Sequence, residues 1–367
     1  MASLKVHIDK VIDNIQKIDN IFENHNILWS LMSKVLCGNH EVLKHIIDSN
    51  VTNNLHSYGD SRLSSLAKVK ELSDNAKTMY IKPPAINNVE DVVDYADISL
   101  NTSFETIEAL SNEADRRNKK HQIVIMIEMG ELREGIMHDN LIDFYDSVFK
   151  LPAIEVIGIG TNLGCMYGIE PTYDKLIQLS LYKQLIEASF KTKINLVSGG
   201  SSITLPLIKE GRIPSAINHF RIGEAAFLGT SPFDNSRFED LHTDAFEYHA
   251  SIVEIEEKSY VPEGKMSDAG IGHTAASEHT PQETSYKALL DFGILDVDTD
   301  EIDPIDGDIN FIGTTSDLTV YDLGKNDGSE GYQYKVGDSI VFNPSYMGVA
   351  RLMNSKFIDT EIEMASK

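Results

Sequence analysis

The sequence predicts an α/β protein in which a (β/α)8 barrel precedes a C-terminal all-β domain. Eight short β-rich runs alternate with longer stretches whose apolar residues lie three and four positions apart, as in amphipathic helices. The runs are apolar on both faces, which is typical of parallel strands covered by helices. After about Leu241 the helical stretches cease, and strand-like runs follow one another directly.

The eight β-rich runs are expected to form the barrel in chain order. They start at residues 27, 54, 77, 96, 122, 154, 194 and 218 and read "ILWSLMSKV", "NLHSYGD", "KTMYIK", "ADISLNT", "QIVIMIEMG", "IEVIGIGTN", "INLVSGG" and "NHFRIG". Helical patterns such as "RLSSLAKVKEL" and "YDKLIQLSLYKQLIEASF" lie between them. Chemistry in such barrels gathers at the carboxyl ends of the strands, so the residues that close each run are the candidates for a site.

The predicted domain boundary follows from the change of pattern. We expect the barrel to occupy residues 1–240 and the β domain residues 241–367, with residues 4–8 able to add a strand to the latter. The segments "AFEYHASIVEIEEKSYVPEGK", "INFIGTTSDLTVYDL" and "VGDSIVFNPSYMGVARLM" read as strands separated by Gly, Pro, Asp and Ser.

The composition is that of an ordinary soluble protein and disfavours nucleic acid and membranes as partners. The 32 basic and 57 acidic residues give a formal charge of −25, which repels phosphate backbones and anionic membranes. The first twenty residues carry charges every few positions and contain no continuous apolar segment, so we expect neither a signal peptide nor a membrane anchor, and a cytoplasmic protein. Cys37 and Cys165 have no metal-ligand spacing and are expected to be free thiols, and no metal is expected.

Lys34 stands at the end of the first predicted strand, where an ammonium group is expensive to bury. A lysine amine in a barrel mouth can form a Schiff base with an aldehyde, including that of pyridoxal phosphate. The alternative is a lysine whose stem packs on the strand end while its ammonium reaches water. Lys34 alone does not decide between the two.

Two glycine-rich turns add to the case for a phosphate-bearing cofactor. "VSGGSSI" follows the seventh run and "FRIGEAA" follows the eighth, and each precedes a helical stretch. Backbone N–H groups at a helix N-terminus can surround a phosphate, and barrels commonly bind phosphate after strands seven and eight. A tight strand-to-helix turn needs glycine in any case, so each turn is weak evidence without the other.

With these motifs in place, the sequence resembles the alanine racemase-like pyridoxal-phosphate enzymes, and within them the ornithine racemase branch. The resemblance covers nearly the whole chain. It is carried by "SKVLCGNH", "YGDSR", "VEDVVDYADISLNT", "IEMGELREG", "GIGTNL", "VSGGSS", "RIGEA", "TTSDLTVYDL" and "YMG", in that order. It implies a pyridoxal 5'-phosphate-dependent amino-acid racemase built as a homodimer, with active sites completed across the interface.

The resemblance assigns roles to individual residues. Lys34 is implied to be the lysine bound to the cofactor and a catalytic base, and Arg133 to hydrogen-bond near the phenolic oxygen of the cofactor. Asn162 takes the place of a histidine beside the cofactor ring. The implied phosphate cradle consists of Ser198, Gly200, Ser201, Ser202, Gly223, Glu224 and, from the partner subunit of the dimer, Tyr346.

Arg221 separates racemases from decarboxylases of the same fold. A carboxylate beside the pyridine nitrogen keeps that nitrogen protonated, whereas an arginine cannot accept its proton. The "RxG" spacing of Arg221 and Gly223 resembles that of racemases. Glu224 is adjacent and is able in principle to compete for the ring nitrogen.

Racemisation needs a second acid–base group opposite Lys34. Alanine racemases supply a tyrosine from the β domain, but the matching segment "SYVPEGKMSDAGIGHTAAS" has no tyrosine after its Pro-x-Gly. Asp268, His273 and Cys165 are the candidates, with Asp268 the first choice.

The substrate is the least determined part of the prediction. The resemblance points to ornithine or a similar amino acid with a long cationic side chain, for which Asp60, Glu131 or Asp317 are possible partners, while Lys82 or Arg62 would suit a carboxylate. Two other functions are the rivals of this interpretation: a decarboxylase of the same fold and a non-enzymatic pyridoxal-phosphate carrier. The β domain argues against the carrier. A zinc-dependent D-amino-acid aldolase or dehydratase would need a His-x-Cys pair, which is absent from the sequence.

Overall fold

The computed structural model describes residues 2–51, 55–267, 270–275, 282–328 and 333–364. The chain divides into two compact units, one made of Lys10–Thr243 and the other of Met1–Asp9 together with Asp244–Lys367. Among the described residues, no helix combines the length and the apolar character that crossing a membrane requires.

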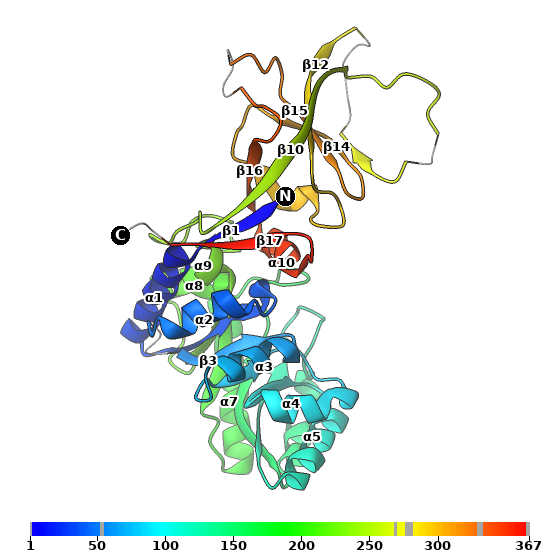
Figure 1. Ribbon diagram of the computed structural model, residues 1–367. Helices are drawn as coiled ribbons and strands as arrows, with labels where there is room; N and C mark the ends of the chain where they lie inside the picture. Colours follow the sequence, from blue (N-terminus) through cyan, green and yellow to red (C-terminus); the bar gives the residue numbers. More distant parts are fainter. Residues whose placement is uncertain (1, 52–54, 268–269, 276–281, 329–332, 365–367) are drawn as a thin grey trace. The chain divides into compact units, whose positions relative to one another are not determined.

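The first unit is a closed barrel of eight parallel strands, which confirms the predicted fold (Figure 1). Its strands are β2 (Leu28–Met32), β3 (Leu55–Asp60), β4 (Thr78–Tyr80), β5 (Ile98–Asn101), β6 (His121–Ile127), β7 (Ile154–Thr161), β8 (Leu196–Ser201) and β9 (His219–Ile222). The barrel closes where β9 pairs with β2 in parallel, with Leu28 opposite His219 and Leu31 opposite Ile222. All eight predicted runs therefore became strands.

Helices cover the outside of this barrel (Figure 1). They are α1 (Ile8–Asn24), α2 (His40–Asp48), α3 (Leu63–Leu72), α4 (Val89–Tyr95), α5 (Phe104–Arg116), α6 (Leu141–Val148), α7 (Tyr173–Phe190), α8 (Leu205–Lys209) and α9 (Glu224–Leu228). Single turns of 3-10 helix precede or interrupt several of them: η1 (Ser33–Leu36), η2 (Ile86–Asn88), η3 (His138–Asn140) and η4 (Ser202–Thr204).

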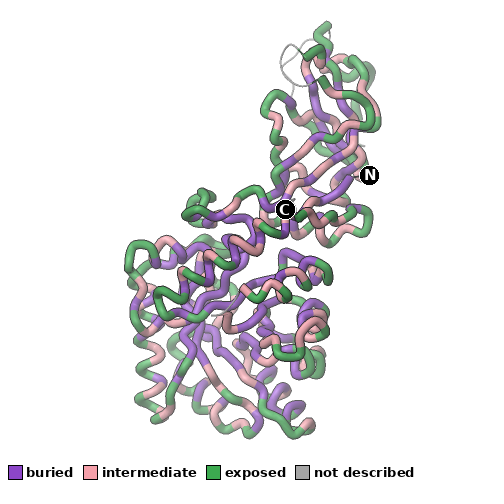
Figure 2. The backbone as a smooth tube through the Cα atoms, turned by 60° about the vertical axis from the view of Figure 1, so that its left-hand side comes forward, coloured by how far each residue is buried: buried purple, intermediate pink, exposed green. Residues whose placement is uncertain are grey.

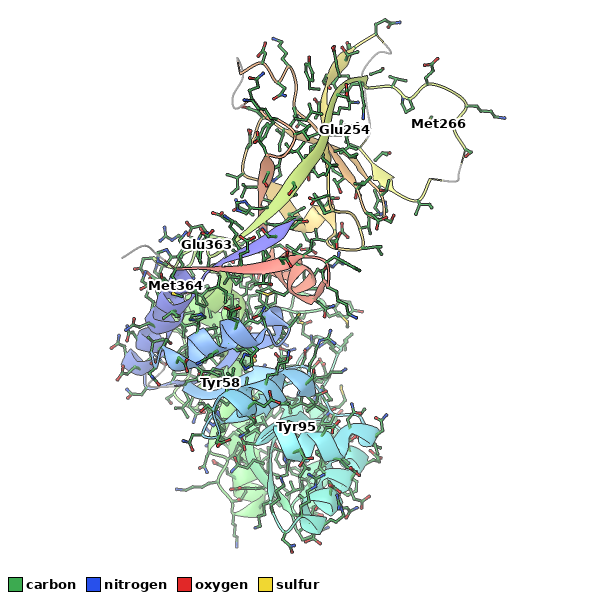
Figure 3. All side chains as sticks on the ribbon, in the orientation of Figure 1. Tyr58, Tyr95, Glu254, Met266, Glu363 and Met364 are labelled. Carbon is green, nitrogen blue, oxygen red and sulfur yellow. The ribbon has the colours of Figure 1, made fainter. Side chains whose placement is uncertain are left out.

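The apolar core of the barrel lies between its strands and the inner faces of these helices (Figure 2). Phe22 of α1 stacks on Trp29 of β2, and the Trp29 indole N–H donates to Asp19 over 2.7 Å. Each fully buried side chain of this size contributes about 1.5–3 kcal/mol. Tyr58 on β3 is 7% exposed, whereas Tyr95 at the end of α4 is 37% exposed, so burial follows the face of each element (Figure 3).

The second unit is a mixed sheet of nine strands. They are β1 (Ser3–His7), β10 (Phe246–Ser259), β11 (His273–Thr274), β12 (Thr284–Leu290), β13 (Ile302–Pro304), β14 (Asn310–Thr314), β15 (Thr319–Asp322), β16 (Ser339–Pro344) and β17 (Asp359–Glu363). The long strand β10, on which Glu254 lies, pairs with β1, β12 and β16 (Figure 3). Because β1 pairs with both β10 and β17, the start of the chain belongs to this sheet.

One segment of this unit differs from the strand that its sequence suggests. In "VGDSIVFNPSYMGVARLM" the strand β16 ends at Pro344 and the helix α10 (Tyr346–Asn354) follows. The hydroxyl of Ser345 caps this helix by accepting the N–H of Gly348 over 3.1 Å. Ser345 is a favoured N-cap residue, and Val349 and Leu352 form the buried face of the helix, so helical spacing prevails over the β-branched composition.

Candidate active site

Lys34 lies in the 3-10 turn η1, directly after the first barrel strand. The sequence suggested that this strand runs to Val35, but it ends at Met32, because the hydroxyl of Ser33 turns back to Asp60 Oδ2 over 3.1 Å. The side chain of Lys34 is exposed at the carboxyl end of the barrel. Lys34 is thus not a buried lysine, and it lies after the first barrel strand as the sequence predicted.

Asp60 closes the second barrel strand and is 1% exposed. Its carboxylate accepts the hydroxyl of Ser33 and the backbone N–H of Arg62, the latter over 2.9 Å. Burial raises the pKa of Asp60 to about 6, even though these hydrogen bonds favour the charged form. A carboxylate so enclosed is not a rim charge for a cationic substrate; it supports the turn that carries Lys34.

The raised pKa of Asp60 makes the stability of the protein depend on pH. The pKa of Asp60 is higher in the folded protein than in the unfolded chain, so this group stabilises the fold fully only below the unfolded pKa, near 4. That stabilisation is lost as the pH rises through about 6. We expect the free energy of unfolding of the wild type to fall relative to Asp60→Asn by about 2 kcal/mol between pH 4.5 and 7.5. Urea denaturation at both pH values measures this difference, with the exposed Asp74 changed to Asn as the control; equal pH dependence of the two variants would contradict it.

Arg133 and Asn162 meet at Glu134, in the loops that follow β6 and β7. Asn162 Nδ2 donates to Glu134 Oε1 over 3.1 Å, and Arg133 Nη2 donates to the same oxygen over 2.6 Å. Burial alone raises the pKa of Glu134, but the bonds from Arg133 outweigh it, so this pKa lies below its usual value. Arg133 also donates to the thiol of Cys165. Because Arg133 Nε also donates to Glu134, two of the five guanidinium N–H groups have no acceptor among the described residues and remain for another group.

Glu131 holds the loop that carries Cys165. It is 2% exposed, and it accepts the backbone N–H groups of Cys165, Tyr167 and Ile169 over 3.0, 2.9 and 2.8 Å. Burial raises its pKa and these bonds lower it, with a net lowering. Like Asp60, Glu131 is a structural carboxylate, and its two oxygens are already engaged.

We expect Glu131→Gln to loosen this loop, because an amide has one acceptor oxygen where the carboxylate has two. The free energy of unfolding should fall by about 1–3 kcal/mol. The backbone amides of Cys165, Tyr167 and Ile169 should exchange hydrogen for deuterium faster, which mass spectrometry of the loop peptide measures. Glu170→Gln, an exposed change in the same loop, is the matched control; equal exchange in both variants would rule out the role of Glu131.

The loops after β8 and β9 are tied together through Ser202. Its buried hydroxyl accepts the backbone N–H of Ala225 over 3.2 Å, which joins the first turn of η4 to the first turn of α9. Ser201 N–H donates to the hydroxyl of Thr204 over 3.2 Å, and Gly223 is the N-cap of α9. Both turns therefore start at the carboxyl end of the barrel, where the first N–H groups of a helix have no partner within it.

Two residues of the expected phosphate cradle have other contacts. The hydroxyl of Ser198 accepts from Arg221 and contacts Nδ1 of His219 over 2.8 Å inside the barrel. A Cβ atom on Gly200 would lie 2.1 Å from the ring of Phe220, so glycine is needed there for close packing of neighbouring strands. Both residues thus have packing or hydrogen-bonding roles in the barrel, and their part in a phosphate cradle stays a prediction.

Arg221 is 8% exposed, on the last barrel strand. Its Nη2 donates to Thr161 O over 2.8 Å and to Asn162 Oδ1 over 3.4 Å, while Nη1 donates to Ser198. Burial lowers the pKa of Arg221 to about 10, which still leaves the guanidinium charged near neutral pH. Glu224, the first residue of α9, is half-buried; burial raises its pKa, and the charge of Lys34 partly opposes that rise.

The structure thus brings most of the expected site residues to one end of the barrel. Arg221, Asn162, Glu134 and Arg133 form a continuous hydrogen-bonded group, and Lys34 interacts electrostatically with Glu224. The half-buried Tyr346 starts α10 in the other unit, and His273 lies on β11 of that unit. Asp268 lies outside the described residues, so its role stays a prediction.

Sequence reasoning missed Glu134 and His219. Glu134 was not among the candidates drawn from the sequence, although a glutamate beside an arginine in "ELREG" is a signal for an ion pair. His219 precedes Arg221 by two positions in "HFRIG", so both side chains are on the same face of β9. That period-two spacing was the available signal.

The barrel unit of this chain matches a known protein family. The family model "Alanine racemase, N-terminal domain" matches residues 6–232. The chain belongs to this family. It is 32% identical to ornithine racemase of Acetoanaerobium sticklandii over 98% of this chain and 99% of that protein. It is 27% identical to lysine racemase of Thermotoga maritima over 98% of each chain.

Solved structures with this fold include alanine racemase of Clostridium difficile 630, with a TM-score of 0.73 at 15% identity, covering 99% of this chain and 96% of that one. Alanine racemase of Bartonella henselae, solved with covalently bound pyridoxal phosphate, has a TM-score of 0.73 at 14% identity and covers 99% of each chain. The chain is thus an enzyme of an amino-acid racemase family.

Proposed function

We propose that this enzyme interconverts the L and D forms of ornithine, or of a similar amino acid with a long cationic side chain, using pyridoxal 5'-phosphate. The observation that carries the proposal is the placing of Lys34 after the first barrel strand, at the same end of the barrel as Arg221 and the turns after β8 and β9. The identity of 32% with an ornithine racemase over nearly the full length supports the choice of substrate.

The donor set at this end of the barrel fits an anionic, aldehyde-bearing group. Ser201, Ser202, Gly223 and Glu224 would hold its phosphate, largely through the first N–H groups of η4 and α9. Arg221 would meet the ring nitrogen and Arg133 the phenolic oxygen. When bound, pyridoxal phosphate supplies an aldehyde that bonds covalently to an amine and a ring that withdraws electrons from the substrate Cα.

The residues of this chain then move the α-proton. Lys34 would hold the cofactor through its side-chain amine and would act as the base that takes the proton from one face of Cα and returns it. Arg221 cannot accept a proton, so it leaves the ring nitrogen unprotonated, which favours rapid return of the proton over side reactions. For the opposite face we propose Asp268, with His273 and Cys165 as the alternatives. Cys165 lies beside Arg133.

Two parts of the proposal concern the second unit. We propose a homodimer in which Tyr346 of one protomer reaches the cofactor phosphate of the other. For the cationic end of the substrate, Asp60 and Glu131 are buried and already hydrogen-bonded, which leaves the exposed Asp317 as the acidic partner among the three candidates.

Incubation of the cofactor-loaded protein with L-ornithine, L-lysine and L-alanine tests the proposal. Chiral chromatography should show D-ornithine accumulating to an equal mixture, with slower or no conversion of alanine and no release of carbon dioxide. Carbon dioxide release would indicate a decarboxylase, and retention of cofactor without any turnover would indicate a carrier. Either result would refute the racemase.

A further inference from the structure

A chain of polar side chains runs through the interior of the barrel, starting at Arg221. The six residues, each in contact with the next, are Arg221, Ser198, His219, Ser30, Ser57 and His56. The Ser198 hydroxyl lies 2.8 Å from His219 Nδ1, and His219 Nε2 lies 2.8 Å from the Ser30 hydroxyl. The hydroxyls of Ser30 and Ser57 are 2.7 Å apart, and the Ser57 hydroxyl lies 3.3 Å from His56 Nδ1. Four of the six residues, from Ser198 to Ser57, are at most 2% exposed.

The bond from Arg221 has a fixed direction, and the groups that follow are all satisfied when each donates to the next. A guanidinium can only donate, so Ser198 accepts from Arg221, and its own proton goes to His219 Nδ1. His219 then carries its proton on Nε2 and donates to Ser30. The Ser30 proton goes to Ser57, and the Ser57 proton goes to His56. In the other neutral tautomer of His219, Nδ1 carries the proton and cannot accept from Ser198. The Ser198 hydroxyl proton would then lack this acceptor in a buried site, which is unfavourable.

We infer that His219 is a positioning residue for the proposed reaction: it holds Arg221 through Ser198, within this one-directional chain of hydrogen bonds. All the bond dipoles of the chain point their negative ends toward the guanidinium, and hydrogen bonds in a row strengthen one another. This stabilisation matters because Arg221 has no charged acceptor among the described residues. Its hydrogen-bond acceptors are two backbone carbonyls, a hydroxyl and an amide oxygen.

His219 is suited to this role because it stays neutral. Burial holds the pKa of His219 well below its usual value, and the nearby charges of Arg221 and Lys77 lower it further. An imidazolium would carry a proton on Nδ1 and could not accept from Ser198. This series of hydrogen bonds therefore does not carry protons to the active site, because Arg221 at its end cannot accept a proton. Its effect is to orient and stabilise a buried cation.

The first test uses the wild-type protein without cofactor or substrate. With ¹⁵N-labelled histidine at pH 7, NMR should show His219 neutral, with its proton on Nε2 and a bare Nδ1; loss of these signals in His219→Asn assigns them. In Ser198→Ala the Nδ1 signal should move toward that of a nitrogen that accepts no hydrogen bond. A proton on Nδ1, or on both nitrogens, would overturn the inference whether or not the enzyme racemises anything.

The second test rests on the proposed function and compares two buried histidines. His219→Met removes both contacts and should lower kcat by about tenfold with KM unchanged. His219→Asn keeps an acceptor near the position of Nδ1 and should recover much of that loss. His121 is 3% exposed and bonds Ser99 over 2.8 Å, without a link to Arg221, so His121→Met is the matched control and should keep the wild-type kcat.

Equal losses of kcat in His219→Met and His121→Met would contradict the positioning role, since they would reflect a general effect of emptying the barrel of a polar side chain. If the wild type racemises no amino acid, the proposed function fails. The nitrogen signals of His219 still decide the direction of the chain in that case.

Discussion

Replacement of Lys34 by alanine is expected to abolish racemisation, with kcat falling by more than about a thousandfold, because the residue supplies both the covalent link and a base. The variant should also lose the cofactor label that borohydride fixes on the wild type, which mass spectrometry of the peptide around residue 34 detects. The change should leave the fold intact, because the side chain of Lys34 is exposed.

Lys82→Ala is the matched control for Lys34. Lys82 is another exposed lysine, and it follows the barrel strand β4 at the same end as Lys34. Its loss should leave the borohydride label in place, with at most an increase in KM if its ammonium holds the substrate carboxylate. A label that survives in Lys34→Ala and disappears in Lys82→Ala would move the covalent link to the other lysine.

The fold could be predicted from the sequence because the period of its apolar residues is regular. Runs such as "QIVIMIEMG" are apolar on both faces, which is typical of a covered parallel strand, and each is followed by a helical stretch. The order of the strands in a closed barrel is the order of the chain, so placing Lys34, Arg221 and the turns after β8 and β9 at one end required no further information.

The direction of individual side chains could not be predicted in the same way. Ser198 lies in a glycine-rich turn motif that suits phosphate, but the pleat of β8 turns its hydroxyl into the barrel, onto Arg221 and His219. Glu131 and Glu134 are three residues apart in one acidic turn; one is buried beneath backbone N–H groups and the other pairs with Arg133. Such differences depend on loops from other strands, which a single segment does not reveal.

Arg221→Gln is expected to lower kcat by about 100-fold to 1,000-fold while changing the stability of the protein little. Two effects on stability oppose each other. Glutamine keeps one amide donor group, so at least one of the acceptors at Thr161 and Ser198 loses its partner. This loss lowers the free energy of unfolding by about 1–3 kcal/mol. Against this, burial lowers the pKa of Arg221 to about 10, which indicates that removing the buried charge recovers about 3 kcal/mol. We therefore expect the free energy of unfolding to change by less than about 2 kcal/mol.

Urea denaturation and kcat measured on the same preparation separate these effects, because a residue whose loss only unfolds the barrel would lower both together. Arg212→Gln is the control for the chemical change: Arg212 is exposed and pairs with Glu210 over 3.1 Å, so its loss should alter neither quantity. Arg221→Lys keeps the charge but not the planar fork that reaches Thr161 and Ser198 together, and its kcat should lie between those of the wild type and Arg221→Gln. If Arg221→Gln retains most of the wild-type kcat, the guanidinium is a structural group of the barrel and the racemase assignment of the "RxG" motif fails with it.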